Sequence, residues 1–448
     1  MSVLLDFLYL IVLVSASPWI LYRLLVTRDG SSLTMRFGAG PVPASRCIWL
    51  HGSSVGEIAL LKSLVPRFEQ DFPGLPLVIS AYTSTGLAAA RAAYGATRVM
   101  PFPIDLSFVV RRRLAQLKPE LVVIVESELW PNFLGALRAQ GIPAALLNGK
   151  ISARSYAFHR RTRVVPRVLS GLSLLAVQTE EHADRFRALG AAAARVQVTG
   201  NMKYDLTPPR MDAARVRDLR RSLGFADDAV VIIGGSLHEG EDAALLDAYG
   251  ALQQRFKNTA LIIVPRYPSE VGSVAIHIEQ AGYQPVLRTA VAGGMRGSRE
   301  VLLVDTVGEL GQLYASANVA FVGGSLFFRG SNKGGHNLME PAIFGLPVLF
   351  GPYNFSFKET VAALLAADGG MLVHDAAELR AALIKLVDNH DLRESMGEQA
   401  RNVVLDAQGA SERNYQLIQR LLAGDSLQLQ PSAQASTMPP ASSDPGSL

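Results

Sequence analysis

Short apolar runs alternate with amphipathic segments along most of this chain, and the alternation constrains its fold more than any other feature. A short apolar run bounded by turn residues is typical of a buried strand, and an amphipathic segment between two such runs is typical of the helix that connects parallel strands. The alternation occurs twice, before and after a stretch with two prolines, 205–212. Because such a stretch is typical of a linker, we predict an α/β protein with two doubly wound domains.

The predicted strands fall into two sets. The first set comprises 48–51, 77–80, 121–126, 144–147, 174–177 and 196–198, and the second comprises 230–233, 261–264, 285–287, 301–304, 319–322 and 348–350. Ligands of doubly wound sheets bind outside the carboxyl ends of the strands. We therefore expect the chemistry in a cleft that the two domains face.

The N-terminal segment 3–22 is almost wholly apolar and has about the length needed to cross a bilayer core. It lacks basic residues ahead of the apolar run and a clear small-residue cleavage site, so we favour an uncleaved anchor over a cleaved signal peptide. Arg23, Arg28 and Arg36 follow it, and the positive-inside tendency places the rest of the chain in the cytoplasm. Asp6 weakens a full span, and a helix inserted into one leaflet would show a similar pattern.

Composition limits the classes of partner. Hydrophobic residues make up 49% of the 448 residues and charged residues 18%, a balance too apolar for a disordered protein. The net charge is +4 and the arginines are scattered, so we expect no nucleic-acid partner. A single cysteine, Cys47, excludes an internal disulfide and an all-cysteine zinc site. The stretch 424–448 has no aromatic residue, lysine or arginine, and we predict a disordered tail.

Glu57 opens the helix that follows the first predicted strand, and two roles compete for its side chain. Ser54 and Glu57 have the spacing of a capping box, in which the serine caps the helix and the glutamate reaches back to the backbone. A carboxylate at a helix start beside a strand end is also well placed as a general base. The residues alone leave both roles open.

A second acidic pair, Glu126 and Glu128, follows the very apolar run 121–125. A carboxylate at the carboxyl end of a buried strand is poorly solvated and is rarely found there without a partner, so Glu126 is the stronger functional candidate. Glu128 could simply cap or solvate the next helix. Lys150 and Lys203 each follow another predicted strand and offer a compact cation for a phosphate or a sugar carboxylate, although a solvated loop lysine is the simpler interpretation.

The second set of strands carries small-residue turns suited to an anion. The sequence Gly-Gly-Ser follows a strand at 234–236 and again at 323–325, and such turns let backbone N–H groups approach a phosphate. Neither is a dinucleotide fingerprint or a Walker loop, so hydride cofactors and triphosphate hydrolysis are disfavoured. Arg266 ends another strand and could bind a phosphate through two nitrogens. In 334–341, glycines lead to a helix start where Glu340 can accept hydrogen bonds from ribose hydroxyls.

A metal site is not favoured by the sequence. His238, Glu239, Glu241 and Asp242 crowd together, but their spacing does not place two histidines on one helix face as in zinc hydrolases. The chain contains no Asp-x-Asp sequence, the motif with which many sugar transferases bind a metal ion and the diphosphate of the donor. We predict a site without a metal or another cofactor.

Six motifs, in order along the chain, resemble those of 3-deoxy-D-manno-octulosonic acid (Kdo) transferases. They are HGSSVGE (51–57), ESELWPN (126–132), TGNMKYD (199–205), GSLHEGE (235–241), VGEL (307–310) and HNLMEPAIFGLPVLFG (336–351). The resemblance implies a GT-B glycosyltransferase with two Rossmann-like domains on the cytoplasmic face of the inner membrane. Such an enzyme moves Kdo from CMP-Kdo to the lipid A precursor, lipid IV(A), with inversion at the anomeric carbon.

The resemblance also implies roles for individual residues. Glu57 falls on the family's catalytic base. Glu126 and Lys203 fall on positions thought to support the transition state, with Glu128 as the alternative to Glu126. The residues that fall on CMP-binding segments are Pro265, Arg266, Val307, Gly308, Glu309, Asn337, Leu338, Met339 and Glu340.

The resemblance completes the expected domain order. The parts are an N-terminal anchor (1–25), an acceptor-binding domain (30–205), a linker (206–212), a donor-binding domain (213–405), a C-terminal helix that crosses back to the first domain (406–423) and a disordered tail (424–448).

The chain departs from the family pattern at three places. Asn148-Gly149-Lys150 stands where Asn-Ala-Arg is more usual, Tyr267 stands where histidine is common, and a few extra residues lie around 331–333. Two other functions stay open. One is a different GT-B nucleotide-sugar transferase or epimerase with a uridine donor, and the other is a membrane-tethered nucleotide-binding protein without enzymatic activity.

Overall fold

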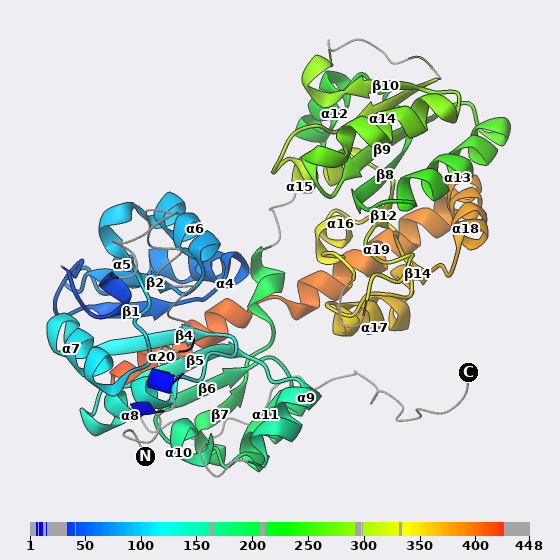
Figure 1. Ribbon diagram of the computed structural model, residues 1–448. Coiled ribbons are helices and arrows are strands. Elements are labelled where there is room, and N and C mark those ends of the chain that lie inside the picture. The colour runs from blue at the N-terminus through cyan, green and yellow to red at the C-terminus, as the bar shows by residue number, and fades with distance from the viewer. Residues whose placement is uncertain are drawn as a thin grey trace. The chain divides into compact units, whose positions relative to one another are not determined.

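Figure 1 shows the computed structural model of the chain, which describes residues 6–7, 9–11, 15, 34–40, 42–161, 165–206, 211–291, 297, 299–330 and 334–424. They divide into two compact units. The first unit comprises the described residues up to Leu206 and those from Gln408 onward, and the second comprises the residues between them. Most of the predicted anchor, part of the predicted linker, the extra residues 331–333 and nearly all of the predicted tail lie outside the described residues.

Each unit is built on a parallel seven-stranded sheet, which confirms the α/β prediction. The strand order is β3-β2-β1-β4-β5-β6-β7 in the first sheet and β10-β11-β9-β8-β12-β13-β14 in the second, so each order changes direction next to its first strand. The first sheet contains β1 (Ile48–His51), β2 (Leu77–Ala81), β3 (Val99–Pro101), β4 (Leu121–Val125), β5 (Ala144–Gly149), β6 (Leu174–Val177) and β7 (Val196–Val198). The second contains β8 (Val230–Leu237), β9 (Thr259–Pro265), β10 (Gln284–Leu287), β11 (Glu300–Leu303), β12 (Val319–Val322), β13 (Val348–Phe350) and β14 (Gly370–Leu372).

The sequence does not predict the two strands β3 and β14. Each has only three residues. β3 ends in Pro101 and β14 begins with Gly370, and both residue types argue against a strand interior. Both strands lie at the edge of a sheet, where a proline or a glycine is tolerated because one side of the strand forms no hydrogen bonds to a neighbouring strand.

Helices connect the strands in both units (Figure 1). In the first unit they are α4 (Val55–Leu60), α5 (Val65–Asp71), α6 (Ser84–Tyr94), α7 (Ser107–Leu117), α8 (Pro131–Ala139), α9 (Ala153–His159), α10 (Val165–Leu169), α11 (Glu180–Ala188) and α20 (Ala410–Leu422). In the second they are α12 (Ala213–Ser222), α13 (Glu241–Arg255), α14 (Val271–Gln280), α15 (Leu310–Leu313), α16 (Met339–Ile343), α17 (Lys358–Ala366), α18 (Ala376–Asp388) and α19 (His390–Ala407).

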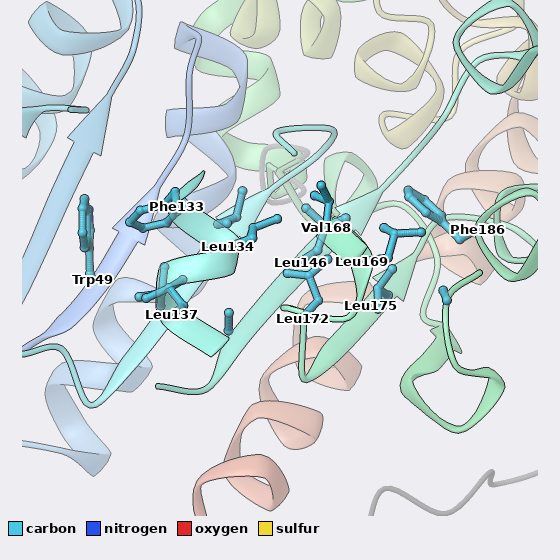
Figure 2. Packing of buried hydrophobic residues seen from close by; sticks show 14 of the residues in the cluster. Trp49, Phe133, Leu134, Leu137, Leu146, Val168, Leu169, Leu172, Leu175 and Phe186 are labelled. Atoms are coloured by element: carbon cyan, nitrogen blue, oxygen red, sulfur yellow. The ribbon is translucent and has the colours of Figure 1, made fainter. Parts of the chain in front are cut away.

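The core of the first unit has a layer on each face of the sheet. Successive side chains of a strand point to opposite faces, so Trp49 of β1 joins the cluster that holds Phe133, whereas its neighbour Leu50 joins the cluster that holds Phe68. Figure 2 shows part of the first layer, with Trp49 beside Phe133 of α8. Burying each large apolar side chain contributes about 1.5–3 kcal/mol. These two layers fix the strand ends on which the candidate site is built.

The C-terminal helix α20, orange-red in Figure 1, packs on the first unit. Tyr415 and Ile418 are buried in the cluster that lines one face of the first sheet. Asp205 fixes the start of the helix, because its carboxylate accepts hydrogen bonds from the backbone N–H groups of Gly409 (2.7 Å) and Ser411 (2.6 Å). The first N–H groups of a helix have no intrahelical partner, so Asp205 acts as a cap supplied from a distant part of the chain.

We expect Asp205→Ala to lower the free energy of unfolding of the first unit by about 1–2 kcal/mol, the usual value of a helix cap. Urea unfolding followed by tryptophan fluorescence measures this unit, because Trp130 is the last tryptophan in the sequence. The control is Asp184→Ala, which removes an exposed carboxylate from α11 and should change the free energy by less than about 0.5 kcal/mol. Equal effects of the two substitutions would show that the cap does not stabilise α20.

No helix among the described residues has both the length and the apolar character needed to span a membrane. The predicted anchor itself falls mostly outside those residues. Of its described part, Asp6 accepts hydrogen bonds from the backbone N–H of Ser107 at the start of α7 (2.8 Å) and from Nδ2 of Asn132 in α8 (3.0 Å). The Asp6 carboxylate, which interrupts the apolar run, is therefore hydrogen-bonded to α7 and α8 of the first unit.

Candidate active site

Glu57 lies in the first turn of α4, directly after β1, and makes the contacts of a capping box with one change: its carboxylate reaches back to the N–H of Ser53 and not to that of the cap residue Ser54. The hydroxyl of Ser54 accepts a hydrogen bond from the N–H of Glu57 (3.4 Å). The Glu57 carboxylate in turn accepts from the N–H of Ser53 (2.6 Å) and from the hydroxyl of Ser54 (2.9 Å). Capping of the helix by Ser54 is therefore confirmed, whereas the glutamate bonds the residue before the cap.

Capping does not prevent Glu57 from accepting a proton. The side chain is half-buried, and burial raises its pKa above the usual range for a glutamate. The negative charges of Glu126 and Glu128 act in the same direction, while the hydrogen bonds from Ser53 and Ser54 act against it. A carboxylate with a raised pKa is a stronger base, so the turn holds a proton acceptor in a fixed orientation.

Glu126 leaves the end of β4 in a strained conformation and lies between two lysines. It is 8% exposed, and its φ of 69° is in the left-handed region, which costs a non-glycine residue about 1–3 kcal/mol. Its carboxylate oxygens lie 2.8 Å from Nζ of Lys150 and 3.1 Å from Nζ of Lys203. Burial alone would raise the pKa of Glu126, but the two lysines outweigh it and hold that pKa below the usual range.

Glu128, the alternative to Glu126, has a different environment. Burial raises its pKa, and the nearby side chains of Ser53 and Trp130 partly offset this effect. Among the described residues, we find no ion pair between Glu128 and a lysine or arginine. The geometry therefore favours Glu126 as the partner of Lys203.

Asn148 joins the two segments that carry the lysines. It is fully buried, with a left-handed φ of 54°. Its Oδ1 accepts a hydrogen bond from the N–H of Met202 (2.9 Å), which begins the short helix η4 (Met202–Leu206). Lys150 lies two residues after Asn148, and Lys203 follows Met202. The sequence does not reveal this bond, and the only signal for the lysine pair is that both residues follow strands of one parallel sheet.

In the second unit, Glu241 fills the turn that follows β12. The side chain is fully buried at the start of α13. Its Oε2 accepts from the N–H groups of Gly324 (2.6 Å) and His238 (3.0 Å), and its Oε1 accepts from those of Ser325 and Leu326 (2.9 Å each). The prediction that this Gly-Gly-Ser turn cradles a phosphate is wrong, because a carboxylate from another segment already occupies its N–H groups.

The other Gly-Gly-Ser sequence is not a turn. β8 extends to Leu237, so Gly234 and Gly235 lie inside the strand. A Cβ atom on Gly235 would lie 2.0 Å from the Tyr314 hydroxyl, and one on Gly234 would lie 2.4 Å from a methyl group of Leu245. Close packing explains these glycines, and their predicted approach to a phosphate is not supported by the structure.

Two histidines meet at the carboxyl ends of β8 and β12. Nε2 of His238 lies 2.9 Å from Nε2 of His336, with the rings within 9° of parallel. Burial lowers the pKa of both imidazoles, that of His336 to about 4, and the positive charges of Arg266 and Arg329 act in the same direction. Both rings are therefore neutral at pH 7, and one donates a hydrogen bond to the other.

The residues predicted to bind CMP lie at the end of β9, on the loops that follow β9, β11 and β12, and at the start of α16, to which Met339 and Glu340 belong. Arg266 and Val307 are exposed, the latter at 81%. Nδ2 of Asn337 donates to Glu340 (3.1 Å), and burial raises the pKa of Glu340. The side chain of Met339 is buried, as is that of Leu338 before it, so these two could contact a ligand only through the backbone. CMP binding by this set stays a prediction.

Three of the four acidic and histidine residues at 238–242, namely His238, Glu241 and Asp242, have structural partners. Glu241 binds the turn after β12, and Oδ2 of Asp242 lies 2.6 Å from Nδ1 of His277. Among the described residues, no group of three or more His, Cys, Asp and Glu side chains is placed to hold a metal ion. The crowding of these residues in the sequence thus reflects two separate structural bonds.

Known proteins identify the family of the chain. A family model of 3-deoxy-D-manno-octulosonic-acid transferase (kdotransferase) matches residues 31–206. The 3-deoxy-D-manno-octulosonic acid transferase of Haemophilus influenzae is 32% identical over 391 residues, which cover 86% of this chain and 90% of that relative. The chain belongs to the Kdo transferase family. The Kdo transferase of Bordetella pertussis is 33% identical over 401 residues, with the same coverage of 86% and 90%. The resemblance of the six motifs is thereby confirmed.

The fold is shared more widely than the sequence. A crystal structure of UDP-N-acetylglucosamine 2-epimerase matches 86% of this chain and 99% of its own with a TM-score of 0.58, but only 12% of the residues are identical. At this identity the likeness shows the fold alone. Membership of the Kdo transferase family therefore rests on the sequence relatives.

Proposed function

We propose that the chain transfers Kdo from CMP-Kdo to the lipid A precursor, lipid IV(A), in lipopolysaccharide biosynthesis. Its relatives from Haemophilus influenzae and Bordetella pertussis are named for Kdo transfer. The observation that carries the proposal is the cluster at the carboxyl end of the first sheet. There Glu126 pairs with Lys203, and Glu57 lies within electrostatic range of Glu126, so three separate motifs supply one site.

The proposed reaction is a single displacement with inversion. Glu57 accepts the proton of an acceptor hydroxyl, and that oxygen forms a bond to the anomeric carbon of Kdo. The bond from the anomeric carbon to the phosphate oxygen breaks, and its electron pair leaves with CMP. The step needs no covalent intermediate, and we propose that it needs no metal ion. Glu126 and Lys203 are proposed to stabilise the charges that develop at the reacting carbon.

The second unit is proposed to bind CMP on the loops after β9, β11 and β12. Arg266 offers a guanidinium to the phosphate. The carboxylate of Glu340 offers an acceptor for ribose hydroxyls. The neutral pair of His238 and His336, which lies near Arg266, offers one N–H group beyond the bond between the rings and adds no charge.

The proposed location is the inner membrane, with one N-terminal anchor and both domains on the cytoplasmic side. The apolar segment 3–22 and the arginines that follow it support this location. The bonds of Asp6 to Ser107 and Asn132 support an anchor held next to the acceptor-binding unit. Fractionation of cells that express the full chain tests the location, since recovery in the soluble fraction contradicts it.

The activity is tested by mass spectrometry of purified protein incubated with CMP-Kdo and detergent-dispersed tetraacylated lipid A precursor, without divalent metal ions. We expect a product heavier by one or more Kdo units. A parallel reaction with UDP-N-acetylglucosamine as the donor tests the uridine alternative and should give no product. Product from the uridine donor alone would replace the proposed function with that alternative.

The pH dependence of the reaction reports on Glu57. A base must be ionised to accept a proton, so kcat/KM should fall as the pH drops through the pKa of Glu57. Because burial raises that pKa, the fall should occur above the pH expected for an ordinary glutamate, whose pKa is about 4.3. A pH profile of kcat/KM for CMP-Kdo measures it. An acid limb at or below the ordinary value would argue against Glu57 as a desolvated base.

A further inference from the structure

Lys150 gives the cluster around Glu126 one more cation than the carboxylate requires. One lysine is enough to neutralise one buried carboxylate, yet Nζ atoms of both Lys150 and Lys203 lie within 3.1 Å of Glu126. The lysine side chains are 39% and 35% exposed, whereas that of Glu126 is 11% exposed. The carboxylate is thus at the base of the cluster, and the two ammonium groups lie nearer the surface.

The cluster can hold a second anion. Each ammonium group has three N–H donors, and Glu126 accepts from each of the two groups, so donors of both are left for another ligand. Two lysines and Glu126 carry a net charge of +1. The other acidic groups in range are Glu57 and Glu128, and the Glu57 carboxylate is already bonded to the N–H of Ser53 and the hydroxyl of Ser54.

The strain at Glu126 also points to a role beyond neutralising charge. The residue keeps a left-handed φ of 69°, which a structural ion pair at a strand end does not require. Asn148, also left-handed, ties the Lys150 segment to the start of η4 and so fixes the separation of the two lysines. The backbone therefore fixes the separation of the two segments, and the Glu126 carboxylate, which contacts both ammonium groups, fixes the ends of the two side chains.

We propose that Lys150, together with Lys203, binds the carboxylate of the transferred sugar acid, and that Glu126 is the positioning residue that holds the two ammonium groups in place. This inference rests on the proposed function. An ulosonic acid carries its carboxylate directly on the anomeric carbon, so this anion must lie beside the reacting centre and near the base. A lysine is suited to it, because its ammonium group is a compact point charge.

The test compares steady-state kinetics of Lys150→Met, Lys150→Arg and wild type in the full-length protein. We expect Lys150→Met to raise the KM for CMP-Kdo about tenfold or more, and Lys150→Arg to restore most of the affinity. The inhibition constant of CMP, which lacks the carboxylate, should not change, nor should the KM for the lipid acceptor. Lys62→Met, at an exposed lysine of the same unit, is the matched control and should leave all constants unchanged.

Three outcomes of the kinetics overturn the proposal. An unchanged KM for CMP-Kdo removes Lys150 from the donor, and a lower kcat at unchanged KM assigns it to the transition state alone. A raised KM for the acceptor would mean that the lysines bind a phosphate of the lipid instead. If wild type transfers nothing, the proposed function fails by itself. Calorimetric titration of wild type and Lys150→Met with CMP-Kdo and with CMP then still tests the carboxylate site.

Discussion

Glu57→Gln is expected to reduce kcat for Kdo transfer by about 10²–10⁴-fold, the usual contribution of a general base. The amide keeps an oxygen that can accept the N–H of Ser53, and its NH₂ group can donate to the hydroxyl of Ser54. The turn before α4 should therefore stay folded while the proton acceptor is lost. Single-turnover rates with CMP-Kdo and lipid acceptor measure the effect.

Two controls separate chemistry from structure in this variant. The melting temperature of Glu57→Gln should stay near that of wild type, and its KM for CMP-Kdo should change little. Glu128→Gln is the comparison, because Glu128 is also a partly buried carboxylate with a raised pKa but lies outside the lysine pair. We expect a much smaller loss from it. A loss as large as that of Glu57→Gln would mean that the base has been assigned to the wrong glutamate.

Patterns local in sequence predict the fold well and the site only in part. The strands β1, β6, β12 and β13 have the bounds that their apolar runs predict, because a buried parallel strand must be apolar on both faces. The capping box at Glu57 is equally local, since all its partners lie within four residues. The edge strands β3 and β14 are missed because β3 ends in a proline and β14 begins with a glycine, residue types that argue against a strand.

Bonds between segments that are distant in sequence are not readable from either segment. The sequence suggests that Glu126 needs a partner, but it does not identify the two lysines that pair with it in the structure. The sequence of the turn after β12 predicts a phosphate site, but in the structure its N–H groups donate to the carboxylate of Glu241. A glycine-rich turn indicates that an anion can bind to its N–H groups. Whether that anion is a ligand or a side chain depends on segments that are distant in sequence.

Glu241→Gln should destabilise the second unit by about 3 kcal/mol. Glu241 has four N–H donors on its two oxygens, and a glutamine can accept on only one of them. Two buried N–H groups would then face an NH₂ group, and each unsatisfied buried donor costs about 1–3 kcal/mol. The same bonds hold the N–H of His238, so the pairing of His238 with His336 should also loosen.

Amide hydrogen exchange measures this prediction directly. Exchange at Gly324, Ser325 and Leu326 should accelerate by more than tenfold in Glu241→Gln, and urea unfolding followed by circular dichroism should show the loss of stability. Glu239→Gln is the matched control, because this exposed glutamate lies two residues earlier and is not bonded to the turn. If donor affinity falls while exchange at the turn is unchanged, Glu241 acts on the ligand itself. Unchanged exchange and unchanged affinity would mean that the turn holds its shape without the carboxylate, and its glycines alone would then account for the motif.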